Sequence, residues 1–144
     1  EPVESDLAEI INAIARGASI DDRLVVATTA GDLKILVRPN AIRRCITNLV
    51  VNAKTHAQTV KVSAERRGGL VEINVDDDGP GIPDEEREAV FKPFYRLDSS
   101  RNPGTGGTGL GLSIARDLAR GSGGDVTLAD SSLGGLRATI TLPV

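Results

Sequence analysis

The chain has 144 residues, 40% of them hydrophobic and 26% charged, and carries a net charge of −3. This length supports one domain with its own core, and the composition is that of a globular protein. Scattered lysines and arginines with a negative net charge argue against a nucleic-acid surface. The sequence shows no apolar run long enough for a membrane span and no signal peptide, and one cysteine, Cys45, excludes an internal disulfide. We therefore expect a soluble intracellular domain.

The N-terminal part of the chain predicts a helix followed by a hairpin. Apolar residues recur at helical spacing over residues 4–16. Two β-branched runs, 24–28 and 33–37, are separated by the turn-like sequence TAGD. We expect these two runs to pair with each other as a β-hairpin.

A second helix is expected over residues 40–56, opened by Pro39. On a helical wheel, Asn48 and Asn52 lie together at one edge of its apolar arc. Asparagine is a poor interior helix residue, so two amides at a buried edge should have polar partners. They either border solvent or a neighbouring loop, or they direct amide oxygens at a metal ion such as Mg²⁺ or at phosphate.

Three other polar residues lie near the end of this helix. Lys54 falls on the opposite, solvent-facing side of the wheel, so we do not expect it to bind phosphate, whereas Thr55 shares the asparagine side. His56, the only histidine, sits at the apolar edge. We expect its side chain to be packed, with a nucleotide contact and a phosphoacceptor role as the alternatives.

The next segment predicts a second hairpin that ends in a buried aspartate. Residues 60–65 and 70–76 alternate apolar and polar around the turn RRGG. The inward face of the second strand continues to Asp77, and a carboxylate on a buried face needs hydrogen bonds. Gly79 and Gly81 leave the backbone open to close approach. Asp-x-Gly-x-Gly either binds a ligand with an exocyclic amine, such as adenine, or is a capped turn.

All three aromatic residues of the chain, Phe91, Phe94 and Tyr95, lie within five positions. This clustering indicates either a local function or a small satellite cluster under a loop. A turn-rich segment with a short helix to about Val90 precedes them, and residues 92–108 have no convincing period and are expected to form a loop.

Residues 104–111 contain five glycines and lead into a helix expected over 109–120. The run fits G-x-G-x-x-G, but no strand precedes it, which argues against a Rossmann site, and the chain has no Gly-Lys for a Walker A loop. Glycines before a helix N-terminus favour phosphate binding or a lid that closes over a ligand. Strands at 124–129 and 136–142 complete an α+β two-layer sandwich with a mixed, mostly antiparallel sheet.

In this order, four motifs resemble the ATP-binding catalytic domain of two-component sensor histidine kinases, in the superfamily that also holds DNA gyrase and heat-shock chaperone ATPases. They are NLVVNA (48–53), DDGPGI (77–82), FKPFYRLD (91–98) and GGTGLGLSIAR (106–116). The resemblance covers nearly the whole chain. It implies a single domain, 1–144, of the Bergerat-type fold with about three helices.

The resemblance also implies a set of site residues. Asn52 would bind Mg²⁺ and Asn48 would lie beside the phosphates of ATP, and these two are the expected catalytic residues. Asp77 would accept a hydrogen bond from the adenine amine. The aromatic residues would anchor a lid at about 95–108. The other expected nucleotide-binding residues are Gly79, Gly81, Ile82, Arg96, Gly107, Thr108, Gly109, Leu110 and Gly111.

The implied reaction is transfer of the γ-phosphoryl group to a histidine. Gyrase-like members of the superfamily carry a glutamate where Asn48 stands, and an amide removes that obvious general base for ATP hydrolysis. Mg²⁺ and positioning would supply most of the catalysis. The acceptor histidine would belong to a separate dimerisation domain. We expect a longer, membrane-anchored parent that acts on a response regulator, with this chain as a cytoplasmic domain making no direct membrane contact.

The sequence departs from the family at two places. Lysine or arginine is usual where Thr55 stands, and Gly-x-Gly-Thr is common where this chain has Leu136 and Arg137. The hydroxyl expected beside the aspartate is therefore either absent or supplied by Thr139. Two alternatives stay open at this point: a single-domain serine kinase of the anti-sigma-factor type, and a degenerate nucleotide-binding or interaction module.

Overall fold

The computed structural model describes residues 2–19, 24–92 and 111–144. Its strands are β1 (Val3–Asp6), β2 (Leu24–Ala30), β3 (Lys34–Val37), β4 (Thr59–Arg67), β5 (Leu70–Asp77), β6 (Asp125–Asp130) and β7 (Leu136–Pro143). Its helices are α1 (Leu7–Ala18), α2 (Pro39–His56) and α3 (Gly111–Gly121), with two 3₁₀ turns, η1 (Asp84–Glu86) and η2 (Ala89–Phe91).

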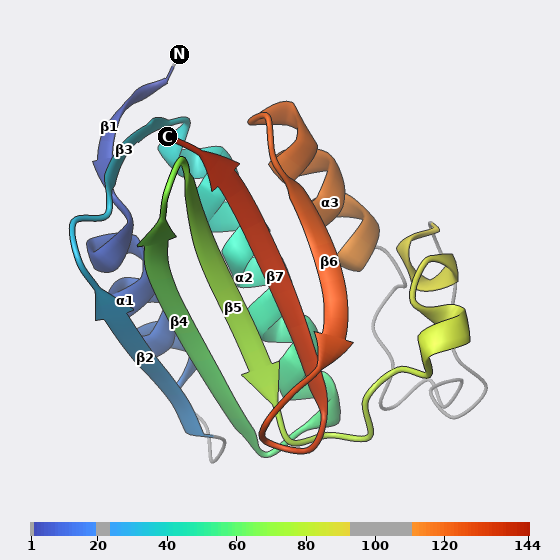
Figure 1. Cartoon of the computed structure of the whole chain (residues 1–144). Helices are drawn as coiled ribbons and strands as arrows, with labels where there is room; N and C mark the ends of the chain where they lie inside the picture. The colour runs from blue at the N-terminus through green and yellow to red at the C-terminus, as the bar shows by residue number, and fades with distance from the viewer. Residues whose placement is uncertain (1, 20–23, 93–110) are drawn as a thin grey trace.

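Five of the strands form a mixed sheet in the order β2-β4-β5-β7-β6 (Figure 1). The β2–β4 pair is parallel and the other three pairs are antiparallel. Strands β1 and β3 pair with each other in a separate two-stranded sheet. The predicted α+β class with a mixed, mostly antiparallel sheet is therefore confirmed, as is the hairpin β4–β5, and the last two predicted strands, β6 and β7, pair with each other.

The predicted hairpin between residues 24–28 and 33–37 is wrong. Strand β2 pairs in parallel with β4, in the register Val25↔Val60, while β3 pairs with β1, in the register Val3↔Val37. Parallel neighbours need a long crossover, and here β3 and α2 together supply it between β2 and β4. Local alternation identifies strands correctly but does not say which strands pair.

The helix boundaries differ from prediction mainly at the N-terminus. The first helix begins at Leu7 rather than at residue 4, because residues 3–6 form strand β1 and the Asp6 carboxylate caps α1 by accepting from the N–H of Ala8 at 3.0 Å. Pro39 opens α2 as predicted. The expected short helix before Val90 consists of the two turns η1 and η2.

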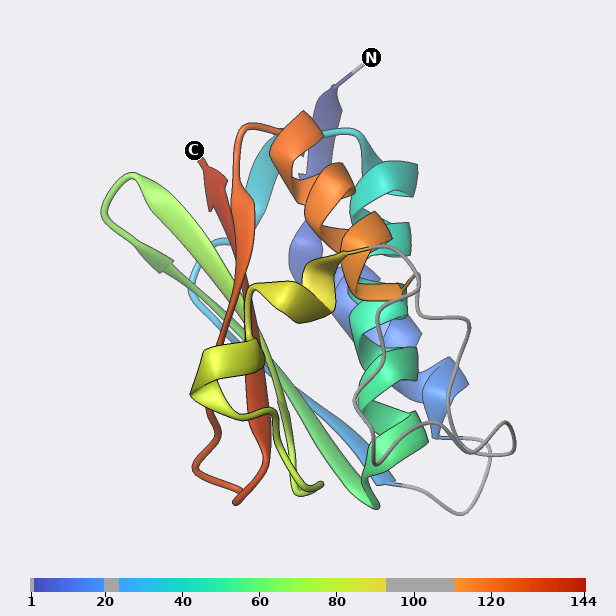
Figure 2. The same cartoon turned by 90° about the vertical axis from the view of Figure 1, so that its right-hand side faces the viewer.

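All three helices lie on one face of the five-stranded sheet, with α2 between α1 and α3 (Figure 2). The core fills the space between these two layers. Its largest fully buried side chains include Ile42, Ile46 and Leu49 of α2 and Val62, Ile73 and Ile140 of the sheet. The sheet's other face carries no helix in the described ranges. Among these residues, no helix is long and apolar enough to cross a membrane.

Candidate functional site

Two asparagines of α2 are the first residues of the candidate site. Asn48 and Asn52 are half-buried, one helical turn apart, and neither side-chain amide has a hydrogen-bond partner within the described residues. The N-terminus of α3 lies beside them, since a Cβ at Gly111 would sit 3.8 Å from the carbonyl oxygen of Asn48. Buried amides are normally satisfied, so two partly buried ones without a partner among the described residues leave room for a ligand.

Asp77 lies at the end of β5, beside the C-terminal end of α2. The residue is 4% exposed, and its Oδ1 accepts from the N–H of Gly79 at 2.9 Å and from the N–H of Leu136 at 3.1 Å. Its carbonyl accepts from the N–H of Gly135 at 3.1 Å. These bonds fix the carboxylate, while Oδ2 has no partner in the part of the chain that the structure describes. Asp77 therefore presents one oriented acceptor.

The glycines around Asp77 allow three chain segments to meet there. A Cβ at Gly79 would lie 2.6 Å from the carbonyl oxygen of His56, and a Cβ at Gly135 would lie 2.6 Å from the carbonyl oxygen of Asp77. Gly81 has a φ of +74°, which other residues rarely adopt. Ile82 is half-buried against the core. The end of α2, the Gly-x-Gly segment and the β6–β7 turn thus converge on Asp77.

Within the described residues, no hydroxyl replaces the one expected beside Asp77. Thr139 donates instead to Oδ1 of Asn74 at 2.6 Å, on the open face of the sheet. The donor that stands beside the Asp77 carboxylate is the backbone N–H of Leu136. Sequence reasoning missed this donor because a backbone amide carries no residue signature.

His56 ends α2 close to Asp77, and its side chain is exposed. The prediction of a packed side chain is therefore wrong. Partial desolvation lowers the pKa of His56 below its ordinary 6.5, and the negative charge of Asp77 opposes this shift. The neighbouring Asp78 accepts from the N–H groups of Thr59 and Gln58, which lower the pKa of its carboxyl.

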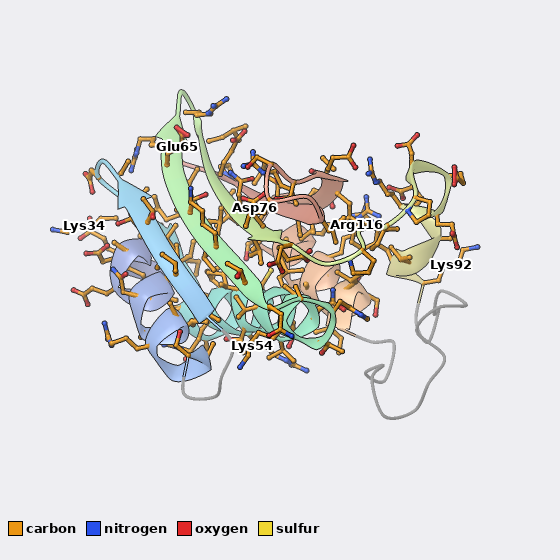
Figure 3. All side chains as sticks on the ribbon, turned by 90° about the horizontal axis from the view of Figure 1, so that it is seen from below. Lys34, Lys54, Glu65, Asp76, Lys92 and Arg116 are labelled. Carbon is orange, nitrogen blue, oxygen red and sulfur yellow. The ribbon has the colours of Figure 1, made fainter. Side chains whose placement is uncertain are left out.

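Lys54 and Thr55 both make contacts within the protein. Lys54 is half-buried rather than solvent-facing, and its Nζ donates to the carbonyl oxygen of Ala18 at the end of α1 at 2.7 Å (Figure 3). The prediction that Lys54 points away from the asparagines holds. The Thr55 hydroxyl donates to the carbonyl oxygen of Val51 at 2.9 Å, within the same helix.

Arg116 of α3 connects this helix to η2 and to β6. Its guanidinium carbon lies 4.1 Å from the ring centre of Phe91, which is 8% exposed. It donates to Glu88 at 3.0 Å and to Asp125 at 2.9 Å (Figure 3). Phe94, Tyr95, Arg96, Gly107, Thr108, Gly109 and Leu110, with the predicted lid at 95–108, lie outside the described residues.

The comparisons with known proteins give the class of this two-layer sandwich. Residues 37–144 match the family described as histidine kinase-, DNA gyrase B- and HSP90-like ATPase, and the chain belongs to this family. Its fold is that of solved histidine kinase ATP-binding domains. The ATP-binding domain of PrrB from Mycobacterium tuberculosis shares 29% identity with a TM-score of 0.84, over 99% of this chain and 97% of that one.

Curated relatives narrow the class to sensor histidine kinases. The chain is 40% identical over 144 residues to sensor histidine kinase GtrS of Pseudomonas aeruginosa, covering 99% of this chain. It is 39% identical over 136 residues to sensor histidine kinase CpxA of Escherichia coli, covering 92% of this chain. The chain spans 29% of the length of each. These relatives favour the histidine kinase class over the anti-sigma-factor-type serine kinase.

Proposed function

We propose that the chain is the catalytic domain of a sensor histidine kinase, which binds Mg-ATP and donates the γ-phosphoryl group to a histidine on a separate domain. One observation carries the proposal. Among the described residues, Oδ2 of Asp77 and the side-chain amides of Asn48 and Asn52 have no hydrogen-bond partner, and all three residues lie on α2 or beside its C-terminal end. The Asp77 carboxylate suits a nucleobase, and the two asparagine amides suit phosphate and its metal ion.

Asp77 is the proposed adenine-binding residue. Its Oδ1 already accepts two backbone N–H groups, so Oδ2 is the oxygen that can accept from the exocyclic amine of the base. A buried site that hydrogen-bonds an amine discriminates strongly against a base without one, because the acceptor would then be left unpaired. Gly79, Gly81 and Ile82 would form the floor around the base.

Asn52 and Asn48 are the proposed residues at the phosphate end. Their neutral amide oxygens, together with water and phosphate oxygens, are a ligand set that suits Mg²⁺. When bound there, Mg²⁺ would neutralise charge on the phosphates. Gly111, at the N-terminus of α3, lies beside Asn48, and the free N–H groups of a helix start attract phosphate.

The helix beside the phosphates contains no carboxylate, which favours transfer over hydrolysis. None of the residues from Pro39 to His56 is aspartate or glutamate, so α2 offers no strong base to activate water. An imidazole needs no such base, because its neutral nitrogen is itself the nucleophile. That nitrogen would bond to the γ-phosphorus as the bond to the bridging oxygen breaks and ADP leaves.

The acceptor is expected outside this chain. The single histidine of this chain, His56, lies beside Asp77 at the proposed adenine end and not at the phosphate end. The proposed partners are therefore the dimerisation and phosphoacceptor domain of a longer parent and, through it, a response regulator. We further propose that the parent is anchored in the membrane and that this domain works in the cytoplasm.

Calorimetric titration of the chain with ATP, with and without Mg²⁺, tests the proposal. We expect Mg²⁺-dependent binding that Asn52→Ala weakens about tenfold, the loss expected for one good polar contact. Asn40→Ala, an exposed asparagine of the same helix, is the matched control and should leave binding unchanged. If the wild-type chain binds neither ATP nor ADP, the proposal is wrong and the interaction-module alternative takes its place.

A further inference from the structure

The site gives the bound nucleotide a direction along α2. Asp77, the proposed adenine-binding residue, and Gly79 lie at the C-terminal end of α2, where the carbonyl oxygen of His56 packs against Gly79. Asn52 and then Asn48 follow toward the N-terminus of the helix. From His56 to Asn48 is eight residues, a rise of about 12 Å. In the proposed binding mode, the terminal phosphate of ATP would point toward the N-terminal half of α2.

Arg44 stands one turn beyond Asn48 in that direction. Four residues along a helix rotate the side chain by only about 40° and advance it by about 6 Å, so Arg44 and Asn48 are neighbours on one side of α2. Arg44 is exposed, and its guanidinium has no hydrogen bond or ion pair within the described residues. A long side chain with free donors thus lies next to the place where the γ-phosphate would be.

The other cationic side chains of α2 point elsewhere. Lys54 bonds the end of α1 at Ala18. Arg43 lines a cleft of about 660 Å³ formed with α1 and β1, together with Arg16 and Glu9. His56 lies at the opposite end of the site, beside Asp77. Within the described part of α2, this leaves Arg44 on the arc of the asparagines.

We propose that Arg44 binds the γ-phosphate of ATP and thereby distinguishes ATP from ADP. The proposal rests on the proposed function. Asn48, Asn52 and Thr55 are all neutral, and the Thr55 hydroxyl is already bonded to Val51. The terminal phosphate is the most negative part of the ligand, and a guanidinium pairs with it through two parallel N–H groups. Arg44 supplies that charge from the helix itself.

Titration of wild type, Arg44→Gln and Arg43→Gln with Mg-ATP and separately with Mg-ADP tests the proposal. We expect Arg44→Gln to weaken ATP binding about tenfold, as for loss of a charge-assisted hydrogen bond, and to leave ADP binding within twofold. Arg43→Gln, the adjacent arginine facing the α1 cleft, should change neither affinity. Arg44→Lys should restore part of the ATP affinity, because it keeps the charge without the paired donors.

The outcomes separate the two proposals. If wild type binds ATP and Arg44→Gln weakens ATP and ADP equally, or weakens neither, the role of Arg44 is wrong while the proposed function stands. If wild type binds no nucleotide, the proposed function and the role of Arg44 are both wrong. Far-UV circular dichroism of each variant shows whether α2 is intact, and a loss of ATP affinity with an intact spectrum supports the direct contact.

Discussion

Arg137 and Asp76 form a bidentate ion pair on the face of the sheet that the helices leave open. Nε of Arg137 donates to Oδ1 at 2.8 Å and Nη2 donates to Oδ2 at 3.2 Å, and Asp76 is only 2% exposed. The hydroxyl of Ser131 donates to the same carboxylate at 2.9 Å. Asp76 is the neighbour of Asp77, so these bonds hold Arg137 and Ser131 against the end of β5 from the opposite face of the sheet.

Arg137→Ala is expected to lower the free energy of unfolding by about 2 kcal/mol, because it leaves a buried carboxylate with one remaining side-chain donor. Urea denaturation measures this change. Arg67→Ala is the control, since Arg67 is exposed and lies 3.6 Å from Glu72, a pair worth about 0.5 kcal/mol. Equal effects of the two substitutions would mean that burial of Asp76 contributes nothing to stability.

Gly135→Ala should damage both stability and nucleotide binding. A Cβ at this position would overlap the Asp77 carboxylate and approach the N–H of Gly79 to 2.6 Å. Overpacking of this kind typically costs about 1–3 kcal/mol. Thermal unfolding and ATP titration measure the two effects. Gly69→Ala is the control, because nothing lies within 4 Å of a Cβ there, and an unchanged Gly135→Ala protein would contradict the close approach.

Asp77→Asn is expected to abolish adenine recognition and leave the fold intact. The amide oxygen can still accept from the N–H groups of Gly79 and Leu136, but the NH₂ group replaces the free acceptor with a donor that faces the adenine amine. The expected loss of ATP affinity is about 30-fold or more. Calorimetry measures it, with an unchanged melting temperature as the check on folding.

Asp78→Asn is the matched control for Asp77→Asn. The Asp78 carboxylate is exposed and accepts from the N–H groups of Gln58 and Thr59, neither of which is a proposed site residue. This variant should bind ATP as wild type does. Tight ATP binding by Asp77→Asn would contradict the proposal that Asp77 binds the adenine.

Local patterns predicted the parts of this fold that local interactions determine. The β4–β5 hairpin follows from alternation around a glycine turn, and the same alternation correctly placed Asp77 on the buried face. The partners of β2 and β3 could not be predicted, because pairing depends on tertiary packing rather than on alternation. One donor to Asp77 was also hidden, since it is the backbone N–H of Leu136, 59 residues away at the start of β7.

The ion pairs of Asp125 predict an acid-dependent loss of stability. Arg116 and Arg120 donate to its Oδ1 at 2.9 and 3.0 Å, and Arg116 is the main cause of a pKa lowered from 3.8 to about 2. A carboxyl whose pKa is lower in the folded state stabilises the fold above about pH 4. This contribution is lost as the pH falls from about 4 to 2.

The expected contribution of Asp125 is about 1 kcal/mol, reduced from the full linkage value because its side chain is 36% exposed. Urea denaturation of wild type and Asp125→Asn at pH 6 and pH 2.5 measures it. The difference in stability between the two proteins should shrink at the lower pH. Asp117→Asn, which removes an exposed carboxylate from the same helix as Arg116, is the control for the loss of one negative charge.

Cys45 should be unreactive in the folded protein, and the rate at which its thiol is alkylated should measure how often α2 and α3 separate. Its thiol is fully buried between α2 and α3, donates to the carbonyl oxygen of Ala115 at 3.2 Å, and has a pKa raised to about 12 by burial. Because the thiolate is the reactive form, alkylation requires α2 and α3 to separate. Iodoacetamide labelling at pH 8, followed by mass spectrometry, should be slow and should accelerate in urea in step with the circular dichroism change.

Nucleotide binding should also change the rate at which Cys45 is labelled. Asn48 and Gly111 lie at the same α2–α3 contact as Cys45, so a ligand that bridges the two helices should suppress their separation. Mg-ATP is expected to slow labelling of wild type and to have no effect on Asp77→Asn. Fast labelling of the folded chain without urea would contradict the burial of Cys45, and equal protection of both proteins would contradict binding at Asp77.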